Sequence, residues 1–216
     1  VIVMSNNTNV GESIINATLS NISDKFTLNN AEINGDLNIL APNVDITEKT
    51  KAIVLTSPSN PTGQVMSKDD LQMIADFAVK HDLFVLSDEI YEKLIYDEDK
   101  QHISIASLGK EIYDRTIVIN GVSKSYAMTG WRIGYACAPA ALDAAMLKVH
   151  QYTMLCAPRM AQHAAAAALS GGFQDGFSAV EQMRAEYDKR RRFLVNSFNE
   201  LGLTCFEPRG AFYAFP

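Results

Sequence analysis

From residue 46 onward, short continuous apolar runs alternate with stretches that have the spacing of amphipathic helices. Three of these runs, at Ala52–Thr56, Leu83–Leu86 and Ile117–Ile119, are too short to be helices. They also lack the polar alternation of a half-exposed strand, so each predicts a strand that is buried on both faces. Helical stretches between buried strands favour parallel pairs with crossover helices. We therefore expect an α/β fold with a mostly parallel sheet and flanking helices.

The helical stretches carry their own start and stop patterns. Ser67-Lys68-Asp69-Asp70 resembles a helix N-cap with an acidic third position, and an apolar stripe follows at Leu71, Ile74, Ala75 and Ala78. Further helices are expected over residues 140–151, over 160–169, where Gly171-Gly172 would end the helix, and over 177–201. The basic run 189–192 is interpreted as a solvated helix face. Residues 203–206 and 211–215 then predict two short strands that open a small C-terminal α+β subdomain.

Residues 1–45 differ from the rest of the chain. They are rich in Asn, Ser and Thr, contain few charges and carry only short apolar clusters. Asn34-Gly35 is a hairpin pattern, because both positions tolerate positive φ. No motif in this segment can be attached to chemistry, so we treat 1–45 as a segment of unclear role.

Composition excludes several classes of protein. The chain is 47% apolar and 20% charged, as is typical of globular domains, and its formal charge of −6 argues against a general nucleic-acid or membrane-surface binder. Its three cysteines form no CxxC pair and its four histidines are scattered, so neither a metal site nor a disulfide framework is expected. We expect a cytoplasmic protein.

Polar side chains follow each of the three predicted strands. Asn60 lies after the first strand, Asp88 and Tyr91 after the second, and Ser123 and Lys124 after the third. Ligands of an open parallel sheet bind at the carboxyl ends of its strands. The sequence therefore predicts that these side chains share one crevice.

The residue types in this crevice fit pyridoxal phosphate. Lys124 sits among small and apolar neighbours, where burial favours the neutral amine that condenses with an aldehyde. Ser123 and Arg132 offer a hydroxyl and a five-donor fork that suit a phosphate. A buried aspartate needs a cationic partner, and the protonated pyridine nitrogen of the cofactor can pair with Asp88. Asn60 and Tyr91 could donate to the phenolate oxygen of the cofactor.

Three of these segments, Ser57–Gly63, Ser87–Tyr91 and Val122–Tyr135, resemble the class I/II aminotransferases, the fold-type-I enzymes that depend on pyridoxal phosphate. Residues 151–158 and 207–213 are similar to the bacterial and archaeal branch that acts on aspartate or aromatic amino acids. The resemblance covers about residues 46–216. It implies a three-layer α/β/α large domain, of which 46–172 would be the cofactor-binding portion, and residues 173–216 as the beginning of the small subdomain. It also implies a homodimer.

The resemblance further implies a role for each residue. Lys124 would hold the cofactor as an internal aldimine and, once freed, would move the proton between Cα of the substrate and C4′ of the cofactor. Asp88 would pair with the ring nitrogen and Tyr91 would bind the ring oxygen, which completes the expected catalytic set. The expected cofactor-binding residues are Asn60, Asp88, Tyr91, Ser123, Lys124 and Arg132. The reaction would be transfer of an amino group from an amino acid to a 2-oxo acid.

The sequence also departs from the family pattern. It shows neither the small-residue turn that cups the phosphate nor the aromatic residue that stacks on the ring, and it stops before the expected arginine for the substrate carboxylate. We therefore expect a chain that is incomplete at both ends. Two alternatives stay open: a truncated or rearranged, non-catalytic remnant of the fold, and a pyridoxal-phosphate-dependent lyase that acts at Cβ.

Overall fold

The computed structural model describes residues 2–5, 31–33, 39–41, 50–96 and 101–216. Hydrogen bonds order five strands as β1-β4-β5-β6-β7, and β2 and β3 form a separate antiparallel pair. The strands are β1 (Ile2–Ser5), β2 (Ala31–Ile33), β3 (Ile39–Ala41), β4 (Thr50–Thr56), β5 (Phe84–Asp88), β6 (Thr116–Gly121) and β7 (Gly134–Cys137). The predicted turn at Asn34-Gly35 lies outside the described residues.

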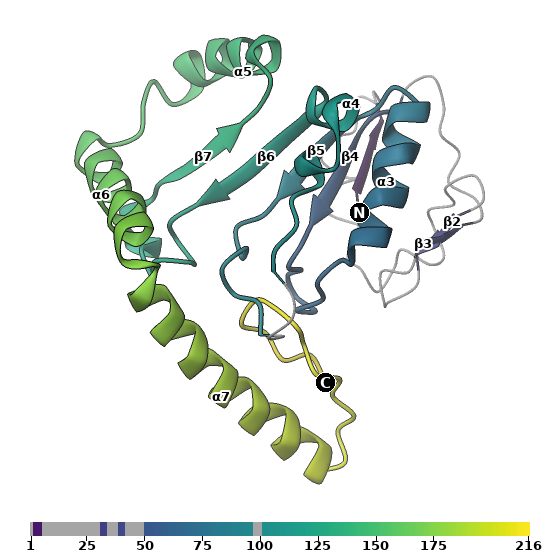
Figure 1. Ribbon diagram of the computed structural model, residues 1–216, viewed down its shortest axis with the longest axis vertical. Coiled ribbons are helices and arrows are strands. Elements are labelled where there is room, and N and C mark those ends of the chain that lie inside the picture. Colours follow the sequence, from purple (N-terminus) through teal and green to yellow (C-terminus); the bar gives the residue numbers. More distant parts are fainter. Residues whose placement is uncertain (1, 6–30, 34–38, 42–49, 97–100) are drawn as a thin grey trace. The chain divides into compact units, whose positions relative to one another are not determined.

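The middle of the five-stranded sheet is parallel. The amide of Val85 donates to the oxygen of Arg115 at 2.9 Å, and the amide of Glu89 donates to that of Ile119 at 2.8 Å, so the partner positions on β5 and β6 advance together. Figure 1 shows β4, β5 and β6 running in one direction. The edge strands β1 and β7 pair antiparallel with β4 and β6. The predicted mostly parallel α/β sheet is confirmed.

The described residues form two compact units, and the chain passes back and forth between them. The first unit consists of Val1–Leu55, Met66–Ser87 and Ser104–Ile117; the second consists of Thr56–Val65, Asp88–Ile103 and Val118–Pro216. The predicted division at residues 45 and 172 remains a prediction. All six predicted site residues belong to the second unit.

Helix α3 (Lys68–Lys80) in the first unit begins as the sequence predicts. The hydroxyl of Ser67 accepts from the amide of Asp70 at 3.1 Å, and the Asp70 carboxylate accepts from the amide of Ser67 at 3.1 Å, which is a complete capping box. The predicted stripe is buried along its whole length, at Leu71, Ile74, Ala75 and Ala78. The described part of this unit also contains two shorter helical segments, η2 (Ile105–Ser107) and α4 (Lys110–Tyr113).

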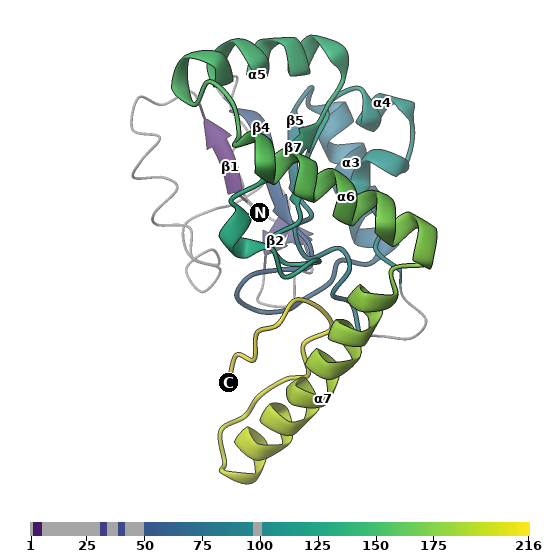
Figure 2. The same ribbon diagram turned by 90° about the vertical axis from the view of Figure 1, so that its left-hand side faces the viewer.

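The second unit contains η3 (Thr129–Trp131), α5 (Ala140–Thr153), α6 (Arg159–Asp175) and α7 (Ser178–Glu200), and α6 leads directly into α7 (Figure 2). The prediction that Gly171-Gly172 ends the helix expected over 160–169 is wrong. Glycine only weakens a helix, and α6 continues to Gly176, which adopts φ +67° as its C-cap. A Cβ on Gly172 would lie 2.6 Å from Cδ1 of Phe177, so this position is needed for close packing.

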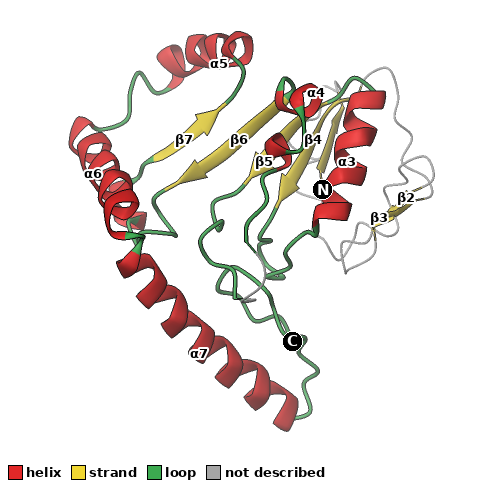
Figure 3. Ribbon diagram, in the orientation of Figure 1, coloured by secondary structure: helices red, strands yellow, loops and turns green. Residues whose placement is uncertain are grey.

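The predicted strands over 203–206 and 211–215 are also absent. Side chains hold this segment instead: the amide of Asn199 binds both the backbone N–H and the oxygen of Cys205 at 3.0 Å. A single bridge, between Ile95 and Gly210, is the only strand-like pairing of this segment with other described residues. Figure 3 shows the segment as a loop.

The prediction that the basic run 189–192 is a solvated helix face is wrong for Arg191. This side chain is 7% exposed and donates to the oxygen of Pro208 at 2.8 Å and to the carboxylate of Asp188 at 2.6 Å. Arg192 does form the expected exposed i, i+4 pair with Asp188, at 3.0 Å. None of the described helices is both long enough and apolar enough to cross a membrane.

Candidate active site

The loop after β4 is held by its own backbone. The amide of Ser59 donates to the oxygen of Gln64 at 2.8 Å, and the amide of Gly63 donates to the oxygen of Ser59 at 2.9 Å. The bonds before Pro58 and Pro61 are cis. The amide of Ser57 donates to the oxygen of Asp88 at 3.2 Å, so the loop begins beside the end of β5. The site residue of this loop, Asn60, is exposed.

This loop packs directly against the C-terminal segment (Figure 3). The oxygen of Gly63 accepts hydrogen bonds from the amides of Arg209 and Gly210, at 3.0 and 2.8 Å. Gly63 has φ +70°, and a Cβ there would lie 2.4 Å from Cβ of Pro208. A Cβ on Gly210 would lie 2.7 Å from Cβ of Pro58. Both glycines are therefore required for this close backbone contact.

Asp88 ends β5 with its carboxylate half-buried. Burial raises the pKa of this carboxyl above its ordinary value, the amide of Ile90 at 3.2 Å lowers it, and the negative charge of Glu89 raises it again. An aspartate whose charged form is penalised by burial is stabilised by a nearby cation. Asp88 forms no ion pair with any described residue.

Tyr91 lies in a cluster of aromatic side chains. Its ring is 3% exposed, and its hydroxyl is hydrogen-bonded to that of Tyr213. Burial and this hydrogen bond raise the pKa of the Tyr91 hydroxyl well above its ordinary value, so it remains a proton donor at neutral pH. The ring of Phe212 packs edge-on against Tyr91 at 5.2 Å and stacks on Tyr187 at 5.5 Å.

Lys124 reaches the same cluster from a different part of the chain. Its Nζ lies 5.4 Å from the centroid of the Phe212 ring, so one aromatic side chain contacts both Lys124 and Tyr91. Lys124 is half-buried, which is more open than its apolar sequence neighbours predict. No described carboxylate lies within ion-pair distance of its amine.

The predicted phosphate ligands, Ser123 and Arg132, are close in sequence, but among the described residues they form no hydrogen bond with each other. Ser123 is half-buried, and its backbone oxygen accepts from the hydroxyl of Thr129 at 2.9 Å. Arg132 is exposed, adopts φ +54° and donates to the oxygen of Thr129 at 2.8 Å. Within the described part of the chain, neither side chain is hydrogen-bonded to Lys124.

Sequence reasoning missed four contacts around this group. Phe212 and Tyr213 lie in the segment 207–213, where the resemblance implies no site residue, and His102, one of the four scattered histidines, pairs with buried Glu89 at 2.7 Å. Nothing in the sequence indicates these pairings, because each joins residues from different loops. The hydroxyl of Ser125, directly after Lys124, is buried without a hydrogen-bond partner among the described residues.

Comparisons with known proteins show which family the chain belongs to. The family model for aminotransferase class I and II matches residues 17–216. The chain belongs to the class I and II aminotransferase family. The match begins at residue 17, so it includes much of the segment to which no resemblance was assigned.

The relatives within this family are similar over most of the chain. An aspartate aminotransferase of Pyrococcus abyssi is 52% identical over 79% of this chain, and an aromatic-amino-acid aminotransferase of Thermococcus litoralis is 47% identical over the same share. The crystal structure of the aromatic aminotransferase from Pyrococcus horikoshii matches 80% of the chain at 49% identity with a TM-score of 0.74. The matched regions amount to 43% of the first two relatives and 45% of the solved chain, so this chain spans less than half the length of these aminotransferases.

The cofactor of this aminotransferase family is pyridoxal phosphate, and the donor set fits it in part. An amine, a carboxylate that burial leaves in need of a cation, and a hydroxyl that stays protonated match the aldehyde, ring nitrogen and ring oxygen of the cofactor. The phosphate has two candidate ligands, Ser123 and Arg132, of which Arg132 is turned to the backbone of Thr129.

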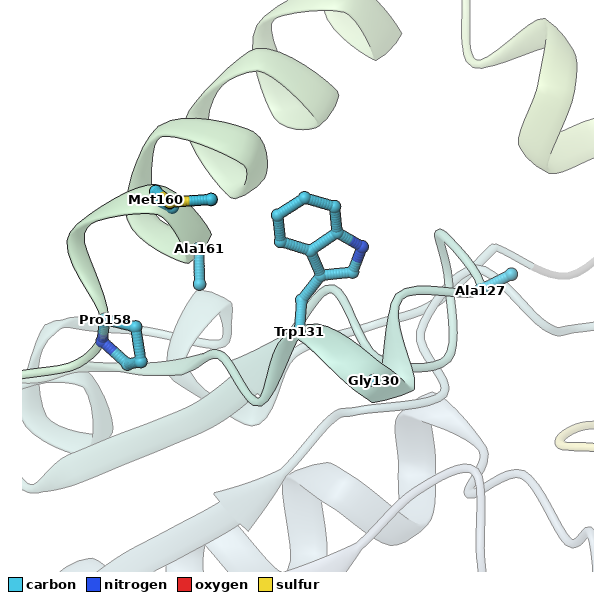
Figure 4. Close-up of a pocket in the computed structure, with 6 residues that line it drawn as sticks. All are labelled: Ala127, Gly130, Trp131, Pro158, Met160 and Ala161. Atoms are coloured by element: carbon cyan, nitrogen blue, oxygen red, sulfur yellow. The ribbon is translucent and has the colours of Figure 1, made fainter.

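Trp131, directly before Arg132, is 46% exposed. It lines an open surface pocket of about 540 Å³ together with Ala127, Gly130, Pro158, Met160 and Ala161. Figure 4 shows its indole beside the first turn of α6, where Met160 and Ala161 lie. Its packing is therefore only partial.

Proposed function

We propose that this chain carries the cofactor-binding portion of a pyridoxal-phosphate-dependent aminotransferase. The observation that carries the proposal is the half-buried Asp88 carboxylate at the end of β5, whose pKa is raised by burial and which has no cationic partner among the described residues. The amine of Lys124 and the ring of Tyr91, which both contact Phe212, belong to the same compact unit.

Each side chain has a defined task. Asp88 would keep a proton on the ring nitrogen, and Tyr91 would donate to the ring oxygen. Lys124 would hold the cofactor through its aldehyde and would move the proton at Cα of the substrate. Pyridoxal phosphate, when bound, would supply a ring that withdraws electrons from the substrate. Asn60 would bind the ring oxygen, and Ser123 and Arg132 would bind the phosphate.

The direct test is the visible absorbance of the purified chain after addition of pyridoxal phosphate. We expect a new band in the wild type and no band in Lys124→Ala, because Lys124 is the one lysine among the described residues whose amine lies over Phe212. Lys148→Ala is the control, since Lys148 is exposed on α5. Borohydride reduction followed by peptide mass mapping should place the adduct on Lys124. An adduct distributed over several lysines would contradict the proposal.

The reaction proposed is transfer of an amino group from an amino acid to a 2-oxo acid. The relatives named for aspartate and aromatic amino acids make these the first donors to test, with a keto-acid product as the readout. Formation of pyruvate and ammonia from a cysteine conjugate would instead indicate a Cβ lyase. Bound cofactor without any half-reaction would indicate a non-catalytic remnant.

A cytoplasmic homodimer is part of this proposal. Large apolar side chains are exposed on and near α5 and α6, notably Tyr152 (93%), Leu155 (76%) and Met160 (78%). A second copy of the chain would cover them. Sedimentation velocity should show a dimer that Met160→Glu weakens, whereas Leu201→Glu, at an equally exposed position (76%), should leave it intact. A wild-type monomer at micromolar concentration would contradict this.

A further inference from the structure

The segment that carries Tyr213 is fixed by its backbone to the loop that follows β5. The amide of Tyr96 in that loop donates to the oxygen of Arg209 at 3.0 Å, and the amide of Ala211 donates to the oxygen of Leu94 at 2.9 Å. The hydroxyl of Tyr96 also donates to the oxygen of Ala211. Leu94 and Ala211 are fully buried. Tyr213, two residues after Ala211, is therefore held in place beside this loop.

The hydroxyl of Tyr213 contacts the hydroxyl of Tyr91, one of the expected catalytic residues. The two hydroxyls are hydrogen-bonded, and the two rings meet edge-on with their centroids 5.7 Å apart. Phe212 packs against both rings, at 5.2 Å from Tyr91 and 5.0 Å from Tyr213. Among the described residues, neither hydroxyl has another hydrogen-bond partner. The two tyrosines thus form a preformed pair.

The hydrogen bond of this pair can run in either direction, and the direction decides what Tyr91 can offer a ligand. Each hydroxyl has one proton and two acceptor lone pairs. If Tyr91 donates to Tyr213, its single proton is already used. If Tyr213 donates to Tyr91, the Tyr91 proton is free for an outside acceptor. An anionic ring oxygen is a stronger acceptor than a neutral phenol, so its presence would select the second direction.

We propose that Tyr213 is a positioning residue that acts through Tyr91: its hydroxyl donates to the Tyr91 oxygen, so that the Tyr91 proton points to the ring oxygen of the cofactor. No proton leaves either residue. Hydrogen bonds in a chain polarise one another, so Tyr91 also becomes a stronger donor. The part of the proposal that concerns the cofactor rests on the proposed function. The contact between the two hydroxyls concerns the chain alone and can be measured without the cofactor.

The cofactor-free readout is the ¹³C NMR signal of the Tyr91 Cζ atom in the full chain, which Tyr91→Phe identifies. We expect this signal to move in Tyr213→Phe, because that variant keeps the ring and removes the hydroxyl. Tyr113→Phe is the matched control: Tyr113 of α4 is 55% exposed, and its substitution should leave the signal in place. A Tyr91 signal that stays unchanged in Tyr213→Phe would overturn the proposal.

The cofactor readout is the dissociation constant for pyridoxal phosphate in Tyr91→Phe, Tyr213→Phe and the double variant. Tyr213→Phe should weaken binding about two- to tenfold, the effect of losing one hydrogen bond. In the Tyr91→Phe background the same substitution should weaken binding no further, because Tyr213 acts only through Tyr91. Fully additive effects would show that the two hydroxyls act independently, which contradicts the proposal.

A graded variant separates hydrogen-bond donation from packing. Tyr213→fluorotyrosine keeps nearly the same shape but has a more acidic hydroxyl, so at a pH where it stays protonated it should strengthen cofactor binding. Weaker binding, as in Tyr213→Phe, would mean that Tyr213 is not the donor. If the wild type binds no pyridoxal phosphate while the Tyr91 signal still moves in Tyr213→Phe, the proposed function fails, and the role toward the cofactor fails with it, but the hydroxyl pair stands.

Discussion

Asp88, a residue of the proposed site, destabilises the cofactor-free chain at neutral pH. Its carboxylate sits half-buried at a strand end, where the amide of Ile90 is its only hydrogen-bond donor among the described residues. The folded chain therefore binds the Asp88 proton more tightly than the unfolded chain does. By linkage, this tighter proton binding stabilises the folded chain fully at a pH below the ordinary aspartate pKa. The stabilisation is lost as the pH rises through the higher pKa that Asp88 has in the folded chain.

Asp88→Asn should therefore stabilise the cofactor-free chain at neutral pH. The amide keeps an acceptor for Ile90 and carries no charge, so the melting temperature at pH 7.5 should rise by about 2–4 °C, as about 1 kcal/mol does in a chain of this size. The gain should shrink as the pH is lowered toward 4. Affinity for pyridoxal phosphate should fall in the same variant. A melting temperature that drops at neutral pH would contradict the raised pKa. Differential scanning calorimetry across pH measures the effect.

For single residues, the sequence predicts which side chains belong to the candidate site but not which side chains they contact. Asp88, Tyr91 and Lys124 could be named because each follows an apolar run, and strand ends in a parallel sheet converge. Phe212, which contacts both Tyr91 and Lys124, could not be named, because that contact joins a strand end to a loop more than eighty residues away. The orientation of Arg132 toward Thr129 depends on a left-handed backbone that the sequence does not specify.

The C-terminal end of helix α6 is a boundary that the sequence does not predict correctly. A glycine pair is a reasonable stop pattern, yet Gly171 and Gly172 lie inside the helix, and the stop comes at Gly176 with Phe177 at φ +61°. The reason is tertiary packing: the ring of Phe177 occupies the space that a side chain on Gly172 would need. The expected C-terminal strands failed for a similar reason, since Asn199 and Arg191 satisfy backbone groups that a sheet would otherwise pair.

The two adjacent glycines of α6 should respond oppositely to the same substitution. Gly171→Ala meets no atom within 4 Å and replaces a poor helix former, so it should stabilise the chain by about 0.5–1 kcal/mol. Gly172→Ala would place Cβ 2.6 Å from Cδ1 and 2.8 Å from Cε1 of Phe177, and overpacking of this kind costs about 1–3 kcal/mol. Urea unfolding of the two variants measures both effects. Equal effects would mean that Phe177 does not contact α6 in solution.

Across the whole molecule, stability and cofactor binding should be linked. A ligand that binds only the folded chain stabilises it, by about 2.7 kcal/mol at a concentration one hundred times its dissociation constant. Pyridoxal phosphate should therefore raise the melting temperature of the wild type. It should raise that of Lys124→Ala much less, because the bond to the amine is lost. Pyridoxal without the phosphate is the control ligand, and a shift equal to that of the phosphate form would exclude Ser123 and Arg132 as phosphate ligands.

One oxygen atom, that of Gly63, joins the two loops that bracket this site. Because it accepts from the amides of Arg209 and Gly210, the backbone that carries Asn60 and the backbone that leads to Phe212 are fastened to each other without any side chain between them. A substitution that shifts residues 207–211 should therefore move Asn60 as well. It should be visible as a change in the colour of the bound cofactor, even though none of those residues belongs to the proposed cofactor-binding set.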